Sequence, residues 1–215
     1  MTRFHLVQSD LVWEHIDANL EHLEHQISSI RSGAIILPEM FSTGFSMASA
    51  KLAESMTGKA VTWLTKQAIQ KQVYICGSII IEEDSRYFNR FVWVSPDGAL
   101  TTYDKRHLFR MAGEHHYYAA GTGQVQLSIN DMQLRPQVCY DLRFPGWNRN
   151  TTGYDVLVYV ANWPAARRQH WMTLLQARAI ENLSYVIAVN RVGKDGNDIE
   201  YVGDSCVIDP WGNNA

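Results

Sequence analysis

Hydrophobic and polar positions along this chain show two kinds of pattern in alternating segments, one typical of helices and one typical of strands. Over residues 12–31 apolar side chains recur every three or four positions, which predicts an amphipathic helix. The same spacing predicts a second helix over residues 59–71, and a third helix is expected over residues 169–182. The first two segments each have one apolar face that must be buried against another element.

Short runs rich in Val, Ile, Tyr and Phe, bounded by turn residues, predict strands between these helices. One lies near the N-terminus, and the others cover residues 34–37, 73–81, 89–95, 100–103, 126–129, 134–139, 155–160, 185–190 and 202–208. Strands interspersed with helices predict a mixed α/β fold, and the sequence shows no repeat, linker or low-complexity stretch. We therefore expect residues 1–215 to form a single domain.

Three of the predicted strands end beside side chains that can do chemistry. One leads into Glu39, another comes just before Lys105, and a third ends at Cys139, directly before a turn with Asp141 and Arg143. A thiol at a strand end, followed by free backbone N–H groups, is an arrangement that suits a nucleophile beside an oxyanion site. Free cysteines are often ordinary core residues, but an acid, a cation and a thiol together indicate catalysis.

These three segments resemble the catalytic signatures of the nitrilase superfamily of carbon–nitrogen hydrolases. The resemblance covers nearly the whole chain and is closest to the bacterial omega-amidase branch. It implies the four-layer α-β-β-α sandwich of the nitrilase type, which periodicity alone does not predict. Further motifs occur in the family's order, namely Met111-Ala112-Gly113-Glu114-His115, Tyr159-Val160-Ala161-Asn162-Trp163-Pro164, Gln176-Ala177-Arg178-Ala179-Ile180-Glu181-Asn182 and Gly203-Asp204-Ser205.

The resemblance also implies a role for each catalytic residue. Cys139 would attack a substrate carbonyl and form a thioester, while Glu39 would take the thiol proton and later activate water. Lys105 would stabilise the oxyanion together with the backbone N–H of Tyr140. Glu114 matches a second glutamate of the superfamily, which would hold Lys105 in place. This chemistry needs no cofactor and no metal.

The residues expected to bind the substrate are less sharply defined than the catalytic ones. Phe109, Met111 and Trp163, together with Phe45, are candidate walls of a pocket, although each could equally belong to an ordinary core. Arg143 is a candidate for binding a substrate carboxylate, but a buried pair with an acid such as Asp141 is an equal alternative. Two further cations are open for the same role, Arg167 and Arg168.

The resemblance implies an amidase that releases ammonia from a small linear amide such as 2-oxoglutaramate or 2-oxosuccinamate. A nitrile hydrolase or an N-carbamoyl hydrolase would use the same residues and stays an alternative. Family members usually continue past the segment at residues 209–212 with a further strand and a tail, which this chain lacks. An inactive remnant that binds without turnover is therefore a second alternative. The family's usual assembly is a homodimer.

The composition bears on the partners and the cellular location of the protein. The chain is 46% hydrophobic and 19% charged with a net charge of −3, which gives no electrostatic reason to expect nucleic acid or an anionic membrane as a partner. No apolar run is long enough to span a bilayer, and the N-terminus lacks a secretory apolar core. Three cysteines without metal-ligand spacing fit the reducing cytoplasm. His22 and His25 are one turn apart but are better explained as part of a solvated helix face.

Overall fold

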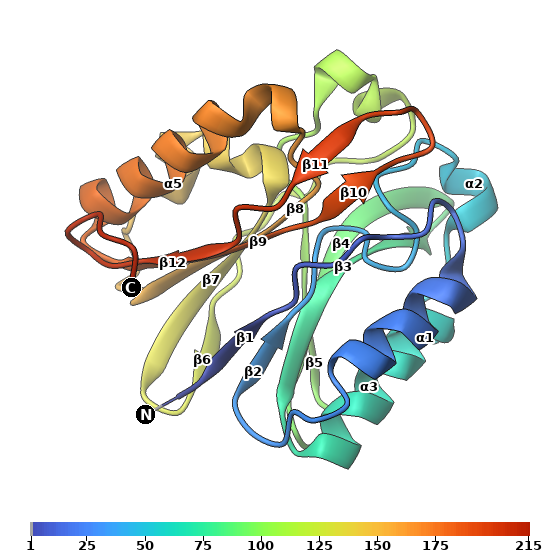
Figure 1. Ribbon diagram of the computed structural model, residues 1–215, viewed down its shortest axis with the longest axis horizontal. Coiled ribbons are helices and arrows are strands. Elements are labelled where there is room, and N and C mark those ends of the chain that lie inside the picture. Colours follow the sequence, from blue (N-terminus) through green and yellow to red (C-terminus); the bar gives the residue numbers. More distant parts are fainter. Residues whose placement is uncertain (1) are drawn as a thin grey trace.

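The computed structural model describes residues 2–215 and contains two five-stranded sheets that pack face to face (Figure 1). The first sheet has, in order, β1 (Phe4–Leu6), β2 (Ala34–Ile36), β3 (Tyr74–Glu83), β4 (Arg86–Val94) and β5 (Leu100–Asp104). The second has β12 (Cys206–Ile208), β9 (Tyr185–Asn190), β8 (Val156–Ala161), β7 (Met132–Val138) and β6 (Leu127–Ile129). A small antiparallel ribbon joins β10 (Val192–Lys194) to β11 (Glu200–Val202).

Helices cover the outer face of each sheet, which completes the four layers (Figure 1). The first sheet is covered by α1 (Ile16–Gln26) and α3 (Lys59–Lys71), and the second by α5 (Arg168–Asn182) and the short α4 (Pro145–Asn148). One further short helix, α2 (Ser49–Leu52), follows the loop after β2. The predicted α-β-β-α sandwich is therefore confirmed. No helix within residues 2–215 is long and apolar enough to cross a membrane.

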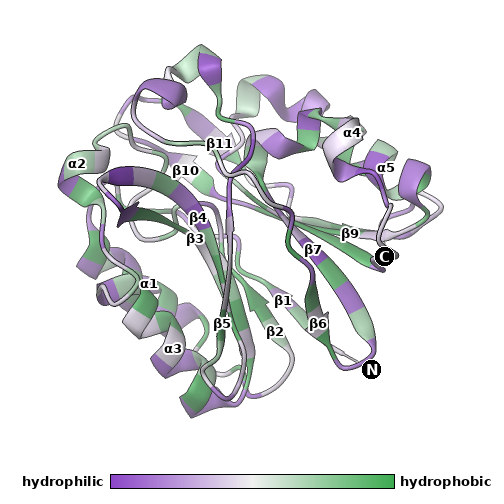
Figure 2. Ribbon diagram, turned by 180° about the vertical axis from the view of Figure 1, so that it is seen from behind, coloured by the Kyte–Doolittle hydropathy of each residue, from purple (hydrophilic) through white to green (hydrophobic). Residues whose placement is uncertain are grey.

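The middle strands are buried on both faces, which explains why they appear in the sequence as continuous apolar runs. In β2, Ile36 packs in the core between the two sheets, whereas its neighbour Ile35 packs in the core beneath α1 and α3. Figure 2 shows hydrophobic residues along the strands and polar residues on the outward sides of the helices. Strands β1, β2 and β3 run parallel, as do β7, β8 and β9.

Two predicted elements differ from the structure for local reasons. The first helix is shorter than the expected residues 12–31, because Glu14 has a positive φ of 54° and His15 caps the helix by accepting the N–H of Ala18. The expected strand over residues 202–208 is split into β11 and β12, because Gly203 and Asp204 have φ of 74° and 58°. A single regular strand cannot contain two left-handed residues.

Candidate active site

Cys139 lies at the end of β7 and begins a short 3₁₀ helix, η3 (Cys139–Arg143). Its φ of 45° places a non-glycine residue in the left-handed region, which is uncommon and costs about 1–3 kcal/mol. The sharp turn ends the strand at the thiol, and the thiol borders the main pocket of this site. The N–H groups that follow belong to the first turn of a helix, where they have no partner within the helix.

The structure brings the other three predicted catalytic side chains together beside this turn. Glu39 follows β2, Lys105 follows β5, and Glu114 begins the short 3₁₀ helix η2 (Glu114–His116). The Nζ of Lys105 donates to Oε1 of Glu39 at 2.8 Å and to Oε1 of Glu114 at 3.0 Å. The side chains of all three residues are fully buried. Lys105 is therefore shared by both carboxylates, and every buried charge of the three has an oppositely charged neighbour.

Asn162, at the end of β8, connects Glu39 with the thiol. Its backbone N–H donates to Oε2 of Glu39 at 2.8 Å, and its side-chain Nδ2 donates to the Glu39 carbonyl at 2.6 Å. Its own carbonyl oxygen lies 3.9 Å from the Sγ of Cys139. The peptide of Trp163 is held in turn by Asn190, whose side chain accepts from the Trp163 N–H and donates to its carbonyl. These contacts hold Glu39 beside Cys139.

The charges of the site determine which groups carry protons at rest. Burial raises the pKa of the Cys139 thiol well above its usual range; Glu39 raises it further, and Lys105 opposes this rise. Burial alone would lower the pKa of Lys105, but Glu114 and Glu39 outweigh it and raise that pKa. Burial raises the pKa of Glu114, and Lys105 partly opposes this. The resting site therefore holds a neutral thiol next to an ammonium group, so the nucleophile needs a base when it attacks.

Asp141 organises the turn after the thiol. Its carboxylate accepts the Tyr103 hydroxyl at 2.7 Å and the backbone N–H groups of His107 and Val138 at 2.9 and 3.1 Å. It also contacts the Nδ1 of His107 at 2.8 Å. Arg143 is not among these partners, so the alternative in which Arg143 pairs with Asp141 is wrong. Asp141 connects the loops that carry Lys105 and Cys139.

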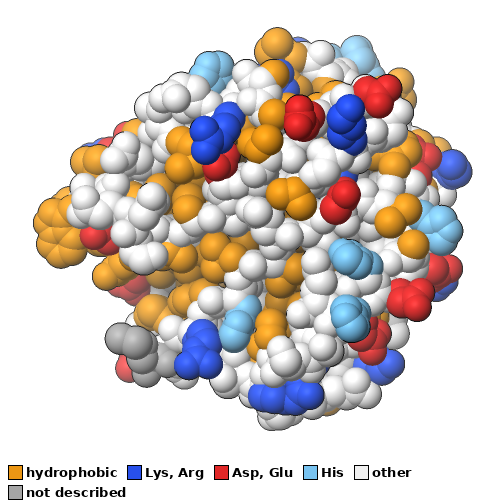
Figure 3. All heavy atoms as spheres, in the orientation of Figure 1, with side chains coloured by type: hydrophobic (Ala, Val, Ile, Leu, Met, Phe, Trp, Pro, Cys, Tyr) orange, Lys and Arg blue, Asp and Glu red, His pale blue; other side chains and the backbone are white. Residues whose placement is uncertain are grey.

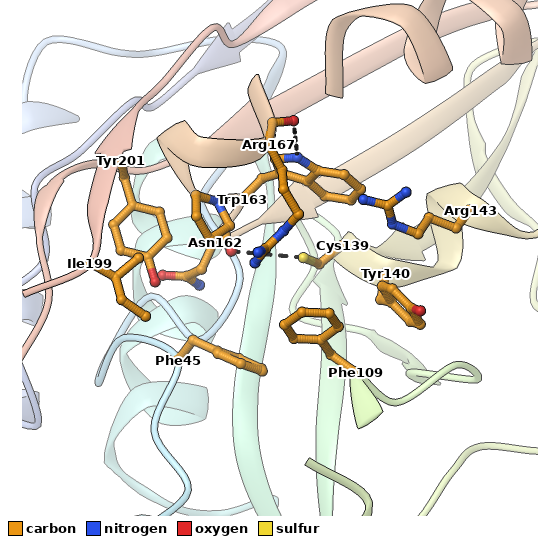
Figure 4. Close-up of a pocket in the computed structure, with 11 residues that line it drawn as sticks. Phe45, Phe109, Cys139, Tyr140, Arg143, Asn162, Trp163, Arg167, Ile199 and Tyr201 are labelled. Atoms are coloured by element: carbon orange, nitrogen blue, oxygen red, sulfur yellow. Dashed lines mark hydrogen bonds between the residues drawn. The ribbon is translucent and has the colours of Figure 1, made fainter. Parts of the chain in front are cut away.

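A pocket of about 410 Å³, including its open mouth, lies over Cys139 (Figure 4). Most of its walls are apolar or aromatic, and its polar lining residues are few. The residues that line it are Phe45, Phe109, Cys139, Tyr140, Arg143, Asn162, Trp163, Pro164, Arg167, Ile199 and Tyr201. Small-molecule sites commonly have this character, apolar walls with a few polar groups that fix orientation.

Five residues predicted to form the pocket or bind the substrate line it, namely Phe45, Phe109, Tyr140, Arg143 and Trp163. Met111 does not, because it lies on the short 3₁₀ helix η1 (Arg110–Ala112) with its side chain 80% exposed. Its predicted place in the pocket wall is therefore wrong. Sequence reasoning missed Ile199 and Tyr201, which the segment between β10 and β11 and the strand β11 bring to the pocket.

Two arginines face the pocket, and a third is occupied elsewhere. The Arg143 guanidinium lies 4.9 Å from the Trp163 ring and contacts Nδ1 of His170 at 2.9 Å. The Arg167 guanidinium lies 5.1 Å from the Phe109 ring. Arg168 instead makes a two-pronged contact with Asp204 at 2.7 and 2.8 Å and does not line the pocket. The mouth of the pocket is therefore positively charged. Within residues 2–215 there is no cluster of three His, Cys, Asp or Glu side chains placed to hold a metal ion.

The fold and this site define a class of hydrolase, and comparison with known proteins agrees. The chain matches the carbon–nitrogen hydrolase family over residues 5–215 and therefore belongs to that family, the nitrilase superfamily. It is 49% identical over 208 residues to omega-amidase YafV of Yersinia enterocolitica, a match that covers 96% of this chain and 81% of that protein. The predicted omega-amidase branch is thereby confirmed, and the chain is an amidase of the carbon–nitrogen hydrolase type.

Two further relatives place the chain in the same family. It is 35% identical over 213 residues to 2-oxoglutaramate amidase of Bacillus subtilis, covering 96% of this chain and 82% of that protein. The crystal structure of XC1258 from Xanthomonas campestris, a CN-hydrolase superfamily protein with an arsenic adduct in its active site, is 44% identical. It superposes with a TM-score of 0.97 and covers 99% of this chain and 84% of that one.

Proposed function

We propose that this protein is an omega-amidase that hydrolyses a small linear amide such as 2-oxoglutaramate or 2-oxosuccinamate to a carboxylate and ammonia. The names of the relatives support this substrate class. The observation that carries the proposal is the arrangement of charges. A thiol with an acid and a lysine beside it lies in a pocket whose lining includes two arginines. Such a site suits an amide at one end of a substrate and an anion at the other.

The contacts of Glu39 and Lys105 support the following reaction. Glu39 takes the Cys139 proton as the sulfur attacks the amide carbon, and the oxyanion is bound by Lys105 and the N–H of Tyr140. Collapse of this intermediate gives a thioester, and ammonia leaves with the proton from Glu39. Water, deprotonated by Glu39, then attacks the thioester and releases the acid and the thiol. Glu114 keeps Lys105 in position throughout.

Arg143 is the residue that we propose binds the carboxylate at the far end of the substrate. Its guanidinium is half-buried against Trp163 and borders the pocket, and its one polar partner among residues 2–215 is His170. Arginine suits this role because its planar group can donate two parallel hydrogen bonds to a carboxylate. Arg167 lies at the same mouth and would add positive charge.

Ammonia release from a panel of compounds tests this assignment. We expect the protein to prefer 2-oxoglutaramate over a neutral amide of similar length, and over nitriles and N-carbamoyl compounds.

In Arg143→Met the preference for the carboxylate-bearing amide should fall about tenfold to a hundredfold through KM, since a charged hydrogen bond contributes about 1.5–3 kcal/mol. Arg168→Met removes an arginine outside the pocket and should leave the preference unchanged. Turnover of nitriles or N-carbamoyl compounds alone would refute the amidase proposal, and turnover of nothing in the panel would favour the inactive alternative.

We also propose that the chain acts as a single domain in the cytoplasm and pairs as a homodimer. The cysteines Cys76, Cys139 and Cys206 are all free, as in a reducing compartment. Large apolar side chains are exposed near the end of α5 and at the C-terminal turn. They include Leu183, which is 79% exposed, and Trp211, which is 78% exposed. Figure 3 shows hydrophobic residues at this edge of the molecule. Patches of this kind commonly mark protein interfaces. Analytical ultracentrifugation should give twice the mass of the chain, and a monomer at all concentrations would contradict the pairing.

A further inference from the structure

Asn89 is a buried amide in the middle of the charged cluster. It lies on β4, only 1% exposed, and its backbone carbonyl accepts the N–H of Lys105 at 3.0 Å. Its side-chain Nδ2 donates to Oε1 of Glu39 at 2.8 Å and lies 3.4 Å from Oε1 of Glu114. One residue therefore fixes the backbone at Lys105 and also contacts both carboxylates that pair with it.

The oxygens that Asn89 contacts are the same two that Lys105 contacts. Each Oε1, of Glu39 and of Glu114, lies between the Lys105 ammonium and the Asn89 amide. Two carboxylates this close repel each other, and a single ammonium balances only one of them. The neutral amide adds a second donor between them without adding a second cation. It thereby favours the position in which both oxygens face Lys105.

This arrangement also determines where the remaining N–H of Lys105 points. An ammonium group has three N–H donors, and two of them are directed at Glu39 and Glu114. The third is then fixed in direction by the positions of those two oxygens. Because Asn89 holds the oxygens, it indirectly aims the donor that is available for the oxyanion of a substrate.

Glu39 is held by a different asparagine on each of its two oxygens. Asn89 contacts Oε1, whereas the backbone N–H of Asn162 contacts Oε2. A carboxylate fixed at both oxygens has a single orientation, which a base needs in order to meet a thiol proton. Asn162 borders the pocket, but Asn89 does not. Any effect of Asn89 on the reaction therefore passes through Glu39, Glu114 and Lys105.

We propose that Asn89 is a positioning residue, whose side-chain amide holds Glu39 and Glu114 around Lys105 and so aims both the base and the oxyanion donor. This inference rests on the proposed roles of those residues. The titratable groups in contact with the amide are Glu39 and Glu114, and both carboxylates contact Lys105 and act on Cys139 and Tyr118. Burial raises the pKa of Tyr118, and Glu114 and Glu39 raise it further.

Two substitutions of Asn89 test the proposal through different readouts. Asn89→Leu keeps the branching of the side chain at Cγ but removes the donor, so kcat should fall about 10²-fold, as expected for misplaced catalytic groups, with KM little changed. Asn89→Asp keeps the shape, and its side chain can donate only while it is protonated. Its activity should therefore decline as the pH is raised over a range where the unaltered enzyme keeps its activity. An Asn89→Leu enzyme with normal kcat would overturn the proposal.

Asn182→Leu is the matched control for the loss of a buried amide. Asn182 bonds Arg178 and Asn150 at the end of α5, away from the pocket, so this variant should lose stability without a change in kcat or pH profile. If the Asn89 variants lowered activity only in proportion to lost folded protein, as in this control, the role of Asn89 would be structural and the proposal wrong.

Alkylation of Cys139 by iodoacetamide separates this proposal from the proposed function, because it needs no amide substrate. The neutral thiol requires a base, so alkylation near neutral pH should be about 10²-fold slower in Asn89→Leu, the lower end of what a positioned base contributes. Equal rates in the two proteins would overturn the positioning role. A slower rate would support it even if no amide in the panel were turned over.

Discussion

Replacing Cys139 with alanine should abolish amide hydrolysis while leaving the fold intact. The proposed reaction passes through a thioester at this sulfur, and no other thiol borders the pocket within residues 2–215. Loss of a covalent nucleophile can lower kcat by about 10⁶-fold, so ammonia release should drop to background. Thermal unfolding of the variant should stay cooperative, since the side chain is small and alanine keeps the Cβ that the turn at φ 45° already accommodates.

Serine at this position should be equally inactive, which distinguishes a thiol requirement from a requirement for any nucleophile. Glu39 must remove the proton of the Cys139 thiol, and burial already raises the pKa of that thiol. A serine hydroxyl holds its proton more tightly than a thiol does, so Glu39 would not remove it. Cys206→Ser is the control, because Cys206 lies on β12, outside the pocket, and should leave kcat unchanged. Substantial activity in Cys139→Ala would contradict the proposed mechanism. A covalent acyl adduct on the Cys139 peptide, seen by mass spectrometry after acid quenching, would support it directly.

The three strand-end residues could be located from sequence because each follows a predicted strand. Strand β2 is buried throughout and β7 is buried over its last five residues, whereas in β5 only Tyr103 is buried. Glu39, Lys105 and Cys139 come from different parts of the chain, but the sheets bring the ends of β2, β5 and β7 together. The helix over residues 59–71 and the strand over residues 185–190 were predicted with their observed bounds, since both are bounded by clear turns and carry regular patterns. Local rules were sufficient for these elements.

The walls of the pocket could not be predicted in the same way, because they depend on how loops cross one another. Tyr201 reaches the pocket only because its hydroxyl is held by Asp195, and the Arg191 guanidinium packs over its ring. Periodicity carries no information about such contacts. For Asn89 the sequence offers one indication, an amide beside apolar residues in a predicted strand. A polar group that is buried there needs a hydrogen-bond partner. The partner itself, Glu39, is 50 residues away in the chain.

Replacing Lys105 with methionine should affect both rate and stability. The oxyanion would lose a charged donor, which typically costs about 10²–10³ in kcat. Glu39 and Glu114 would be left buried without their cation, and breaking a buried ion pair in this way costs about 3–5 kcal/mol. Chemical denaturation monitored by Trp fluorescence, together with ammonia release, measures the two effects on the same protein.

The stability loss in Lys105→Met should depend on pH, and the sign follows from Glu114. Burial raises the pKa of Glu114, and Lys105 opposes that rise, so removing Lys105 raises this pKa further. A carboxyl group whose pKa is raised on folding stays protonated and uncharged at low pH, where it is cheap to bury. Its contribution to stability is lost as the pH rises through the folded-state pKa. The destabilisation should therefore be smallest in acid and grow toward neutral pH; a loss that was constant with pH would contradict the proposed cluster of charges.

A second substitution separates the structural role of Lys105 from its catalytic role. The variant Lys105→Met combined with Glu114→Gln removes one of the two buried carboxylates that lack a cation. Part of the lost stability should therefore return, because neutral replacements of buried ion pairs are often well tolerated. The rate should not return, because the oxyanion donor is still absent. Recovery of both stability and kcat in the double variant would mean that Lys105 serves only to neutralise Glu114. Recovery of stability alone would assign it a direct part in the reaction.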